Sequence, residues 1–183
     1  MIAREMLAKS ADAVRASERL AGDVVRVAEL IAKAFRDGHR LYVCGNGGSA
    51  ADAQHFVAEL IGRFTRERDP YPAIALTTNT SVLTAVANDY EFDEIFARQV
   101  RALVRPGDVL VAISTSGKSE NVARALRSAP KGATRVVLMG SDGPMAELAD
   151  VALRAPGGST AEIQAAHAAL IHAVCAVLDD RLA

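Results

Sequence analysis

The sequence predicts an α/β fold: a doubly wound parallel sheet of five strands with helices on both faces. Three observations support this prediction. Five short runs of Val, Ile and Leu lack polar alternation, which is typical of strands buried on both faces. Segments with a helical spacing of apolar residues separate these runs, and such alternation favours a parallel sheet. The 183 residues suffice for one domain with a sizeable core.

The chain opens with a helical region, residues 2–37, where apolar side chains recur at helical spacing and Gly38 provides a stop. The expected strands lie at residues 40–44, 73–77, 108–114, 134–139 and 150–155. Helices are expected between them at residues 49–63, 81–87, 92–103, 119–128 and 143–149. A last helix runs from about Thr160 to the C-terminus, and the charged stretch 63–72 is expected to be a surface connection.

The composition argues against several partners. The formal net charge is −1, which gives no electrostatic reason to expect nucleic acid or an anionic membrane. No signal peptide pattern opens the chain, and no uninterrupted apolar stretch approaches the roughly 18 residues of a membrane span. Cys44 and Cys175 lie far apart in apolar surroundings, which suits free thiols in a reducing compartment. We therefore expect a cytoplasmic protein.

Two junctions between an expected strand and the next helix are rich in small residues: "GNGGS" after residues 40–44 and "TSGKS" after residues 108–114. Helix N-termini at such junctions present free N–H groups and bind anions, and ligands of open α/β sheets lie at the carboxyl ends of the strands. Ordinary tight turns would explain either loop alone. Two in one small domain favour a ligand with a phosphate group. The second junction adds the hydroxyls of Ser114, Thr115, Ser116 and Ser119.

A dinucleotide site is a competing interpretation, because Gly45, Gly47 and Ala50 match the glycine pattern of that site. Such a site needs an acidic residue at the end of the next strand, roughly 20 residues on. Here that strand ends in residues 77–79, Thr-Thr-Asn, which disfavours the dinucleotide. "TSGKS" also lacks the first glycine of a P-loop.

Two helices carry polar side chains suited to catalysis or metal binding. His55 and Glu59 are four residues apart on the helix after the glycine loop, so they share a face; alone, such a pair is more often a solvated contact. The apolar last helix carries Gln164, His167 and His172, which need polar partners. Gln164 and His172 share a face, but about 12 Å of helix separates them, a long span for one metal ion. His167 points elsewhere and is interpreted as structural.

Four segments together resemble the phosphoheptose isomerase family of sugar isomerase (SIS) domains. They are "LYVCGNGGSAADAQHFVAEL", "TSVLTAVANDYEFDEIFARQV", "VAISTSGKSENV" and "AEIQAAHAALIH". The resemblance covers almost the whole chain, and it implies that residues 1–183 form a single SIS domain. It implies a three-layer sandwich and a homotetramer with active sites between subunits, in which residues 1–37 serve oligomerisation. It also implies the interconversion of sedoheptulose 7-phosphate and D-glycero-D-manno-heptose 7-phosphate through a cis-enediol, the first step of nucleotide-activated heptose biosynthesis.

The resemblance also implies roles for individual residues. Glu59 would be the catalytic base and His172 the acid. The substrate-binding residues would be Asn46, Gly47, Gly48, Glu59, Asn88, Asp89, Ser114, Thr115, Ser116, Ser119 and Gln164. One Zn²⁺ per subunit would be held by His55, Glu59, Gln164 and His172. Because a Gln ligand is unusual and the set lacks Cys, other divalent ions remain open. The chain departs from the family pattern at Ala165, where Glu is usual, and at Glu91, where Gly is usual.

A non-catalytic alternative also stays open. The segments "AQHF" and "RERDPYPAIAL" resemble an SIS scaffold protein that binds the bacterial replication initiator. That relative generally lacks the Glu of the first helix and the His of the last one. The presence of Glu59 and His172 favours the isomerase, because a scaffold needs neither a base nor an acid facing one cleft.

Overall fold

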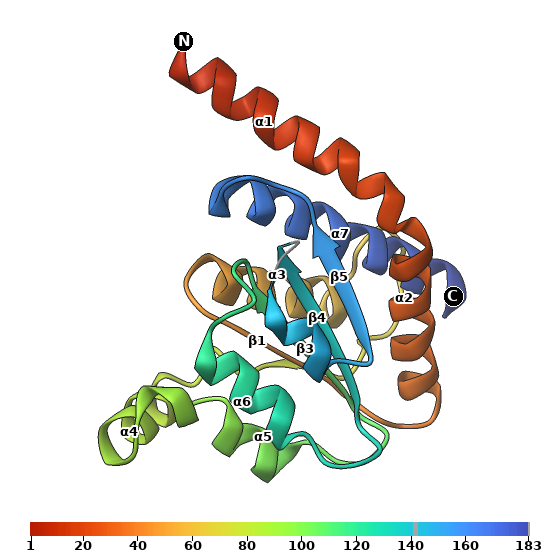
Figure 1. Cartoon of the computed structure of the whole chain (residues 1–183). Helices are drawn as coiled ribbons and strands as arrows, with labels where there is room; N and C mark the ends of the chain where they lie inside the picture. Colours follow the sequence, from red (N-terminus) through yellow and green to blue (C-terminus); the bar gives the residue numbers. More distant parts are fainter. Residues whose placement is uncertain (141–142, 183) are drawn as a thin grey trace.

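A parallel five-stranded sheet forms the centre of the protein in the computed structural model, which describes residues 1–140 and 143–182 (Figure 1). The strands are β1 (Leu41–Gly45), β2 (Ala73–Ala75), β3 (Val109–Ser114), β4 (Thr134–Gly140) and β5 (Val151–Ala155). Their order is β2-β1-β3-β4-β5, and every neighbouring pair is parallel. The order reverses between β1 and β3, the point where doubly wound sheets bind their ligands.

Helices cover both faces of the sheet, as the sequence predicts (Figure 1). The helices are α1 (Ile2–Ala16), α2 (Ala21–Arg36), α3 (Gly48–Ile61), α4 (Thr80–Asp89), α5 (Ala97–Leu103), α6 (Glu120–Ser128) and α7 (Thr160–Arg181). Leu41 and Val43 of β1 face a core shared with α2, α3 and α7. Tyr42 and Cys44 face a second core shared with α5 and α6. This three-layer sandwich explains why the central strands β1 and β3 are buried along their whole length.

Three expected elements differ in detail. The helical region 2–37 is divided into α1 and α2 by a 3₁₀ turn at Ser17–Leu20. The segment 92–103 holds the 3₁₀ turn Phe92–Glu94 before α5, and residues 143–149 form the 3₁₀ helix Pro144–Leu148. Ala13 is the buried residue of α1, which extends away from the body of the molecule (Figure 1). The two ends of the region therefore have different environments: α2 lies in the core, whereas α1 is largely exposed.

The last helix, α7, is long and apolar enough to cross a membrane by length and composition alone. Helices in the core of a soluble protein meet the same test. Here α7 packs on α1, α2 and α3. Its Leu170, Ile171 and Val174 belong to the core beside the sheet. The apolar composition of α7 is thus accounted for in part by packing inside the fold.

Candidate functional site

The two predicted loops lie side by side at the carboxyl edge of the sheet. Gly45, the last residue of β1, pairs with Ile113 next to the end of β3. The loops are joined by two amide side chains: Asn46 Nδ2 donates to Asn121 Oδ1 at 2.8 Å, and Asn121 Nδ2 donates to Asn46 Oδ1 at 2.9 Å. Asn121 was not among the residues predicted from the sequence. Its amide side chain lies in the first turn of the helix that follows the hydroxyl loop, and this position could have suggested a role in the site. This pair fixes the two loops relative to each other.

The glycine loop also contacts the last helix. Gly47 adopts φ +54°, a conformation that glycine allows readily. A Cβ at Gly48 would lie 2.1 Å from Nε2 of Gln164, so a larger residue there would displace the end of that side chain. The structure therefore places Gln164 against the glycine loop. Its role as a metal ligand stays a prediction.

The second loop presents hydroxyl groups at the start of α6. Ser114 is buried at the end of β3, and its Oγ lies 3.1 Å from Oγ of Ser119. The main-chain N–H of Lys118 donates to Ser116 Oγ at 3.2 Å, and the Thr115 carbonyl accepts from Gly140 N at 3.0 Å. Ser119 precedes α6 without capping it through its side chain. The N–H groups of the first turn and these hydroxyls can serve an anion together.

Three side chains from two helices converge beside this edge. His55 and Glu59 of α3 are partly buried, and His172 of α7 is exposed. His55 Nε2 lies 3.1 Å from Glu59 Oε1 and 3.2 Å from His172 Nε2. One ligand atom from each residue lies within 4.8 Å of the others. The structure thus brings three of the four predicted ligands together within a single chain.

The chemistry of this cluster fits a divalent cation. A ring nitrogen carries at most one proton, so a proton on His55 Nε2 cannot serve both Glu59 and His172. A cation at this point would accept lone pairs from both imidazoles and from the carboxylate. Two nitrogens and one carboxylate oxygen form a donor set acceptable to Zn²⁺ and to other first-row metals.

The predicted sugar-binding pair, Asn88 and Asp89, lies elsewhere in the chain. Both are exposed at the end of α4, and Asn88 Nδ2 donates to Asp89 Oδ1 at 2.8 Å. The helix has no buried residue and lies at the margin of the molecule (Figure 1). Within the part of the chain that the structure describes, no hydrogen bond or ion pair joins this pair to the loops or to the cluster. The role of Asn88 and Asp89 in binding the sugar therefore stays a prediction.

Two further ionisable groups lie on the same helices. The Oδ2 atom of Asp52, one turn before His55, is buried and has no partner among the described residues. Burial raises the pKa of Asp52, and the nearby His55 opposes that rise. Sequence reasoning missed Asp52, although its spacing from His55 places it on the same side of α3. His167 is fully buried beside the main chain of Met139, and burial lowers its pKa to about 4, which agrees with a structural role.

Comparison with known proteins places this arrangement in a family. Residues 7–141 match the family model of the SIS domain. The phosphoheptose isomerase of Geotalea daltonii is 52% identical over 167 residues, which cover 90% of this chain and 87% of that protein. Two solved structures of phosphoheptose isomerases are similar over nearly the full length. The one from Neisseria gonorrhoeae has a TM-score of 0.91 and 44% identity, with 97% of each chain covered.

The second solved structure, from Francisella tularensis, has a TM-score of 0.87 and 33% identity, and it covers 98% of this chain and 100% of that one. The likeness thus extends from the sheet to both flanking helical layers, and it includes the helices that carry the His/Glu cluster. The chain belongs to the phosphoheptose isomerase family of SIS-domain proteins.

Proposed function

We propose that this protein is an aldose–ketose isomerase that interconverts sedoheptulose 7-phosphate and D-glycero-D-manno-heptose 7-phosphate, the first step of nucleotide-activated heptose biosynthesis. The observation that carries the proposal is the meeting of Glu59 and His172 around His55, next to two anion-binding loops. Family membership supports the same reaction. The scaffold alternative is disfavoured, because a scaffold has no need of the His/Glu cluster and because the similar proteins are phosphoheptose isomerases.

The side chains can divide the reaction between them. Isomerisation moves a proton between C1 and C2 and shifts the carbonyl through a cis-enediol. Glu59 accepts the carbon-bound proton as base, and His172 acts as acid, donating to the carbonyl oxygen the proton of the ring nitrogen that faces away from the cluster. The hydroxyls of the second loop hold the phosphate end of the sugar, so remote binding energy orients the reacting carbons. Asn46, Gly47 and Gly48 form the neighbouring glycine loop, and Gln164 lies against it.

We further propose a divalent ion, Zn²⁺ and one per subunit, at the His/Glu cluster. His55, Glu59 and His172 would hold it, with Gln164 as the fourth ligand that the resemblance implies. When bound, the ion would polarise the substrate carbonyl. Glu59 has two carboxylate oxygens, so one can face the ion while the other accepts a proton. The donor set supports a divalent cation more strongly than it supports zinc in particular.

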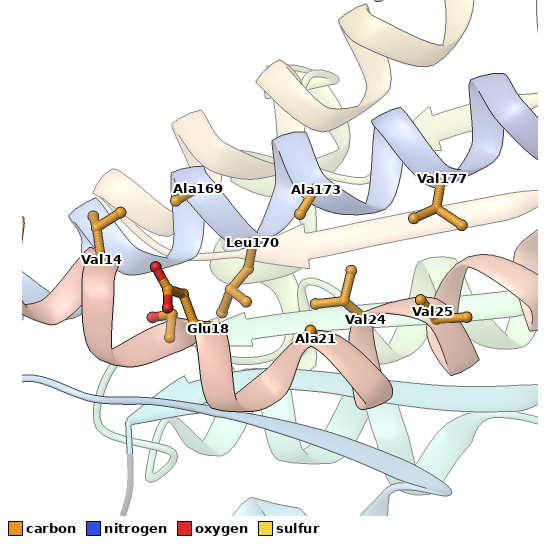
Figure 2. Close-up of a pocket in the computed structure, with 10 residues that line it drawn as sticks. Val14, Glu18, Ala21, Val24, Val25, Ala169, Leu170, Ala173 and Val177 are labelled. Atoms are coloured by element: carbon orange, nitrogen blue, oxygen red, sulfur yellow. The ribbon is translucent and has the colours of Figure 1, made fainter.

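The assembly that we propose is a homotetramer with active sites between subunits, to which residues 1–37 contribute. Apolar side chains of α1 are exposed at Ile2, Met6 and Leu7. A groove of about 300 Å³ lies between the α1–α2 region and α7. Figure 2 shows its apolar lining, which includes Val14, Ala21, Val24, Val25, Ala169, Leu170, Ala173 and Val177. A second copy of the chain would cover these surfaces and could bring Asn88 and Asp89 to a neighbouring cluster.

A cytoplasmic location suits the chemistry of the two cysteines. Cys44 and Cys175 are both buried and free. Burial raises the pKa of each thiol to about 12, so neither forms a reactive thiolate at neutral pH. We expect sugar phosphates and copies of the chain as partners, rather than nucleic acid or membranes.

The direct test is an assay with sedoheptulose 7-phosphate, performed after chelation and again after Zn²⁺ is added back. We expect formation of the aldose with metal present, loss of activity with chelator, and recovery on readdition. In D₂O, solvent deuterium should enter the substrate at C1 or C2. A wild-type protein that shows neither product nor exchange with metal supplied would overturn the isomerase proposal and favour the scaffold.

A further inference from the structure

Residues 63–72, which connect α3 to β2, form a nearly buried ion pair with α7. The sequence predicts this charged stretch to be a surface connection, but the side chains of Arg68 and Asp179 are only 9% and 2% exposed. Arg68 Nε donates to Asp179 Oδ1 at 3.0 Å. The connection is therefore anchored to the last turns of α7. We call residues 63–72 the strap.

The carboxylate of Asp179 accepts several hydrogen bonds from the strap. Its Oδ2 accepts from Thr65 N at 2.9 Å, from Thr65 Oγ1 at 3.0 Å and from Arg66 N at 3.1 Å. Burial by itself raises the pKa of Asp179, yet the bonds from Thr65, Arg68 and Arg66 together hold that pKa below its usual value. Asp179 is thus a charged acceptor that fixes the strap to α7.

Arg68 extends from this carboxylate to the end of the other site helix. Its Nη2 donates to the Glu59 carbonyl at 2.8 Å, and its Nη1 donates to the Leu60 carbonyl at 2.9 Å. These carbonyls belong to the last turn of α3, where a helix lacks N–H partners of its own. The guanidinium also lies 4.0 Å from the centre of the Tyr71 ring, which stacks on Phe35. One planar cation therefore joins the end of α3 to the end of α7.

The ends of α3 and α7 that Arg68 joins lie close to the two candidate catalytic residues. Glu59 is itself the residue whose carbonyl Arg68 binds, and His172 lies two helical turns before Asp179 on α7. Phe64 of the strap packs on the His172 ring, with ring centres 5.6 Å apart. Apolar packing between the helices has no preferred direction, whereas a guanidinium bonded at both ends fixes distance and orientation.

We propose that Arg68 is a positioning residue of the isomerase: by joining Asp179 to the Glu59 and Leu60 carbonyls, it sets the separation between Glu59 and His172. This inference rests on the proposed function for its kinetic consequence. The geometric consequence, a properly spaced His/Glu cluster, does not depend on which sugar is bound.

The test compares Arg68→Lys with Arg66→Lys. Lysine keeps the charge near Asp179 but cannot reach two carbonyls at once. Arg66 is a matched control because it also contacts this end of α7, through the Asp179 carbonyl and Asp180, yet no contact of its side chain with α3 is present among the described residues. The readouts are kcat, KM and the affinity for Co²⁺ followed by its visible absorption, all measured well below the melting temperature.

We expect kcat and Co²⁺ affinity of Arg68→Lys to fall about tenfold or more, as for residues that orient metal ligands. KM for the sugar phosphate should change little, because the phosphate loop begins a different helix. Arg66→Lys should resemble wild type. If Arg68→Lys is only less stable, with kcat and Co²⁺ affinity of the folded protein equal to those of Arg66→Lys, Arg68 is merely structural and the inference is wrong.

The test also covers two further cases, a variant that does not fold and a wild type that is inactive. Should Arg68→Lys not fold, Asp179→Asn removes the charge while keeping the shape and one acceptor oxygen, and the same losses are expected. Should wild type prove inactive on heptose phosphates, the proposed function fails on its own. The Co²⁺ affinities of the variants then still decide whether Arg68 spaces the cluster, because that readout needs no substrate.

Discussion

His55 on α3 and His172 on α7 face each other with 3.2 Å between their Nε2 atoms, and Glu59 lies 3.1 Å from the same nitrogen of His55. A bound divalent cation would stabilise the folded protein, because the unfolded chain does not hold these three groups together. At a hundredfold excess of ion over Kd, the stabilisation is about 2.7 kcal/mol. We expect Zn²⁺ to raise the melting temperature of wild type. His55→Ala should lose most of that rise, and a rise equal to that of wild type would place the ion elsewhere.

Glu59→Gln tests the base. The amide keeps the size of the side chain but cannot take up the proton, so kcat should fall by about 10²–10⁴-fold while the assembly stays folded. Deuterium exchange into the substrate should vanish in this variant. In His172→Asn, kcat should fall similarly while some exchange persists, because abstraction precedes protonation of the oxygen. Glu67→Gln, a change in an exposed carboxylate of the strap, should retain wild-type kcat.

Ser116→Ala combined with Ser119→Ala tests the phosphate loop. Losing two hydroxyls at the start of α6 should raise KM strongly, and kcat should fall too if the anchor orients the sugar. Ser128→Ala, at the other end of the same helix, is the matched control. Steady-state kinetics decide the point, and unchanged values for the double variant would mean that the phosphate binds elsewhere.

The exposed apolar face of α1 provides a test of assembly. Light scattering of wild type at micromolar concentration should give four times the 19.3 kDa mass of one chain. Leu7→Asp places a charge among side chains that we expect to be covered, so it should lower that mass. Arg4→Gln, an exposed change on the same helix, should leave it unaltered. A monomeric mass for wild type contradicts the tetramer.

His167 should make stability depend on pH. Its pKa is about 4 in the fold and near 6.5 in the unfolded chain, because burial disfavours the charged ring. Between these values the unfolded state binds more protons, so stability falls as pH drops from 6.5 to 4, by about 3 kcal/mol in all. Urea unfolding at several pH values should show this slope in wild type. His167→Leu should flatten it, and an identical slope in the two proteins would assign the effect to other groups.

Local sequence patterns were enough to predict most of the fold. Each predicted strand falls within two residues of an observed one, because apolar runs between glycines and polar turns define buried strands. The division of the N-terminal region was missed. Ser17 begins that 3₁₀ turn with its hydroxyl donating to the Ala13 carbonyl at 2.9 Å, and both Ser17 and Leu20 are buried. No glycine or proline lies within this 3₁₀ turn to mark the break between α1 and α2 in the sequence. The break follows instead from tertiary packing.

The site was predicted as far as local spacing allows. The pairing of His55 with Glu59 follows from one turn of helix, whereas the approach of His172 depends on how α3 packs on α7. Two of the missed residues, Asn121 and Arg68, bind partners 75 and 111 positions away in the chain. Contacts at such separations leave no periodicity in a single sequence. Asn88 and Asp89 remain predictions whose test needs the assembled protein.

The reciprocal bonds between Asn46 and Asn121 have a consequence for the enzyme under changing conditions. Neither amide ionises in the physiological pH range, and neither bond joins opposite charges. Acid, alkali and dissolved salt therefore act weakly on the contact between the glycine loop and the hydroxyl loop. The spacing between the two binding loops should therefore stay the same across these conditions.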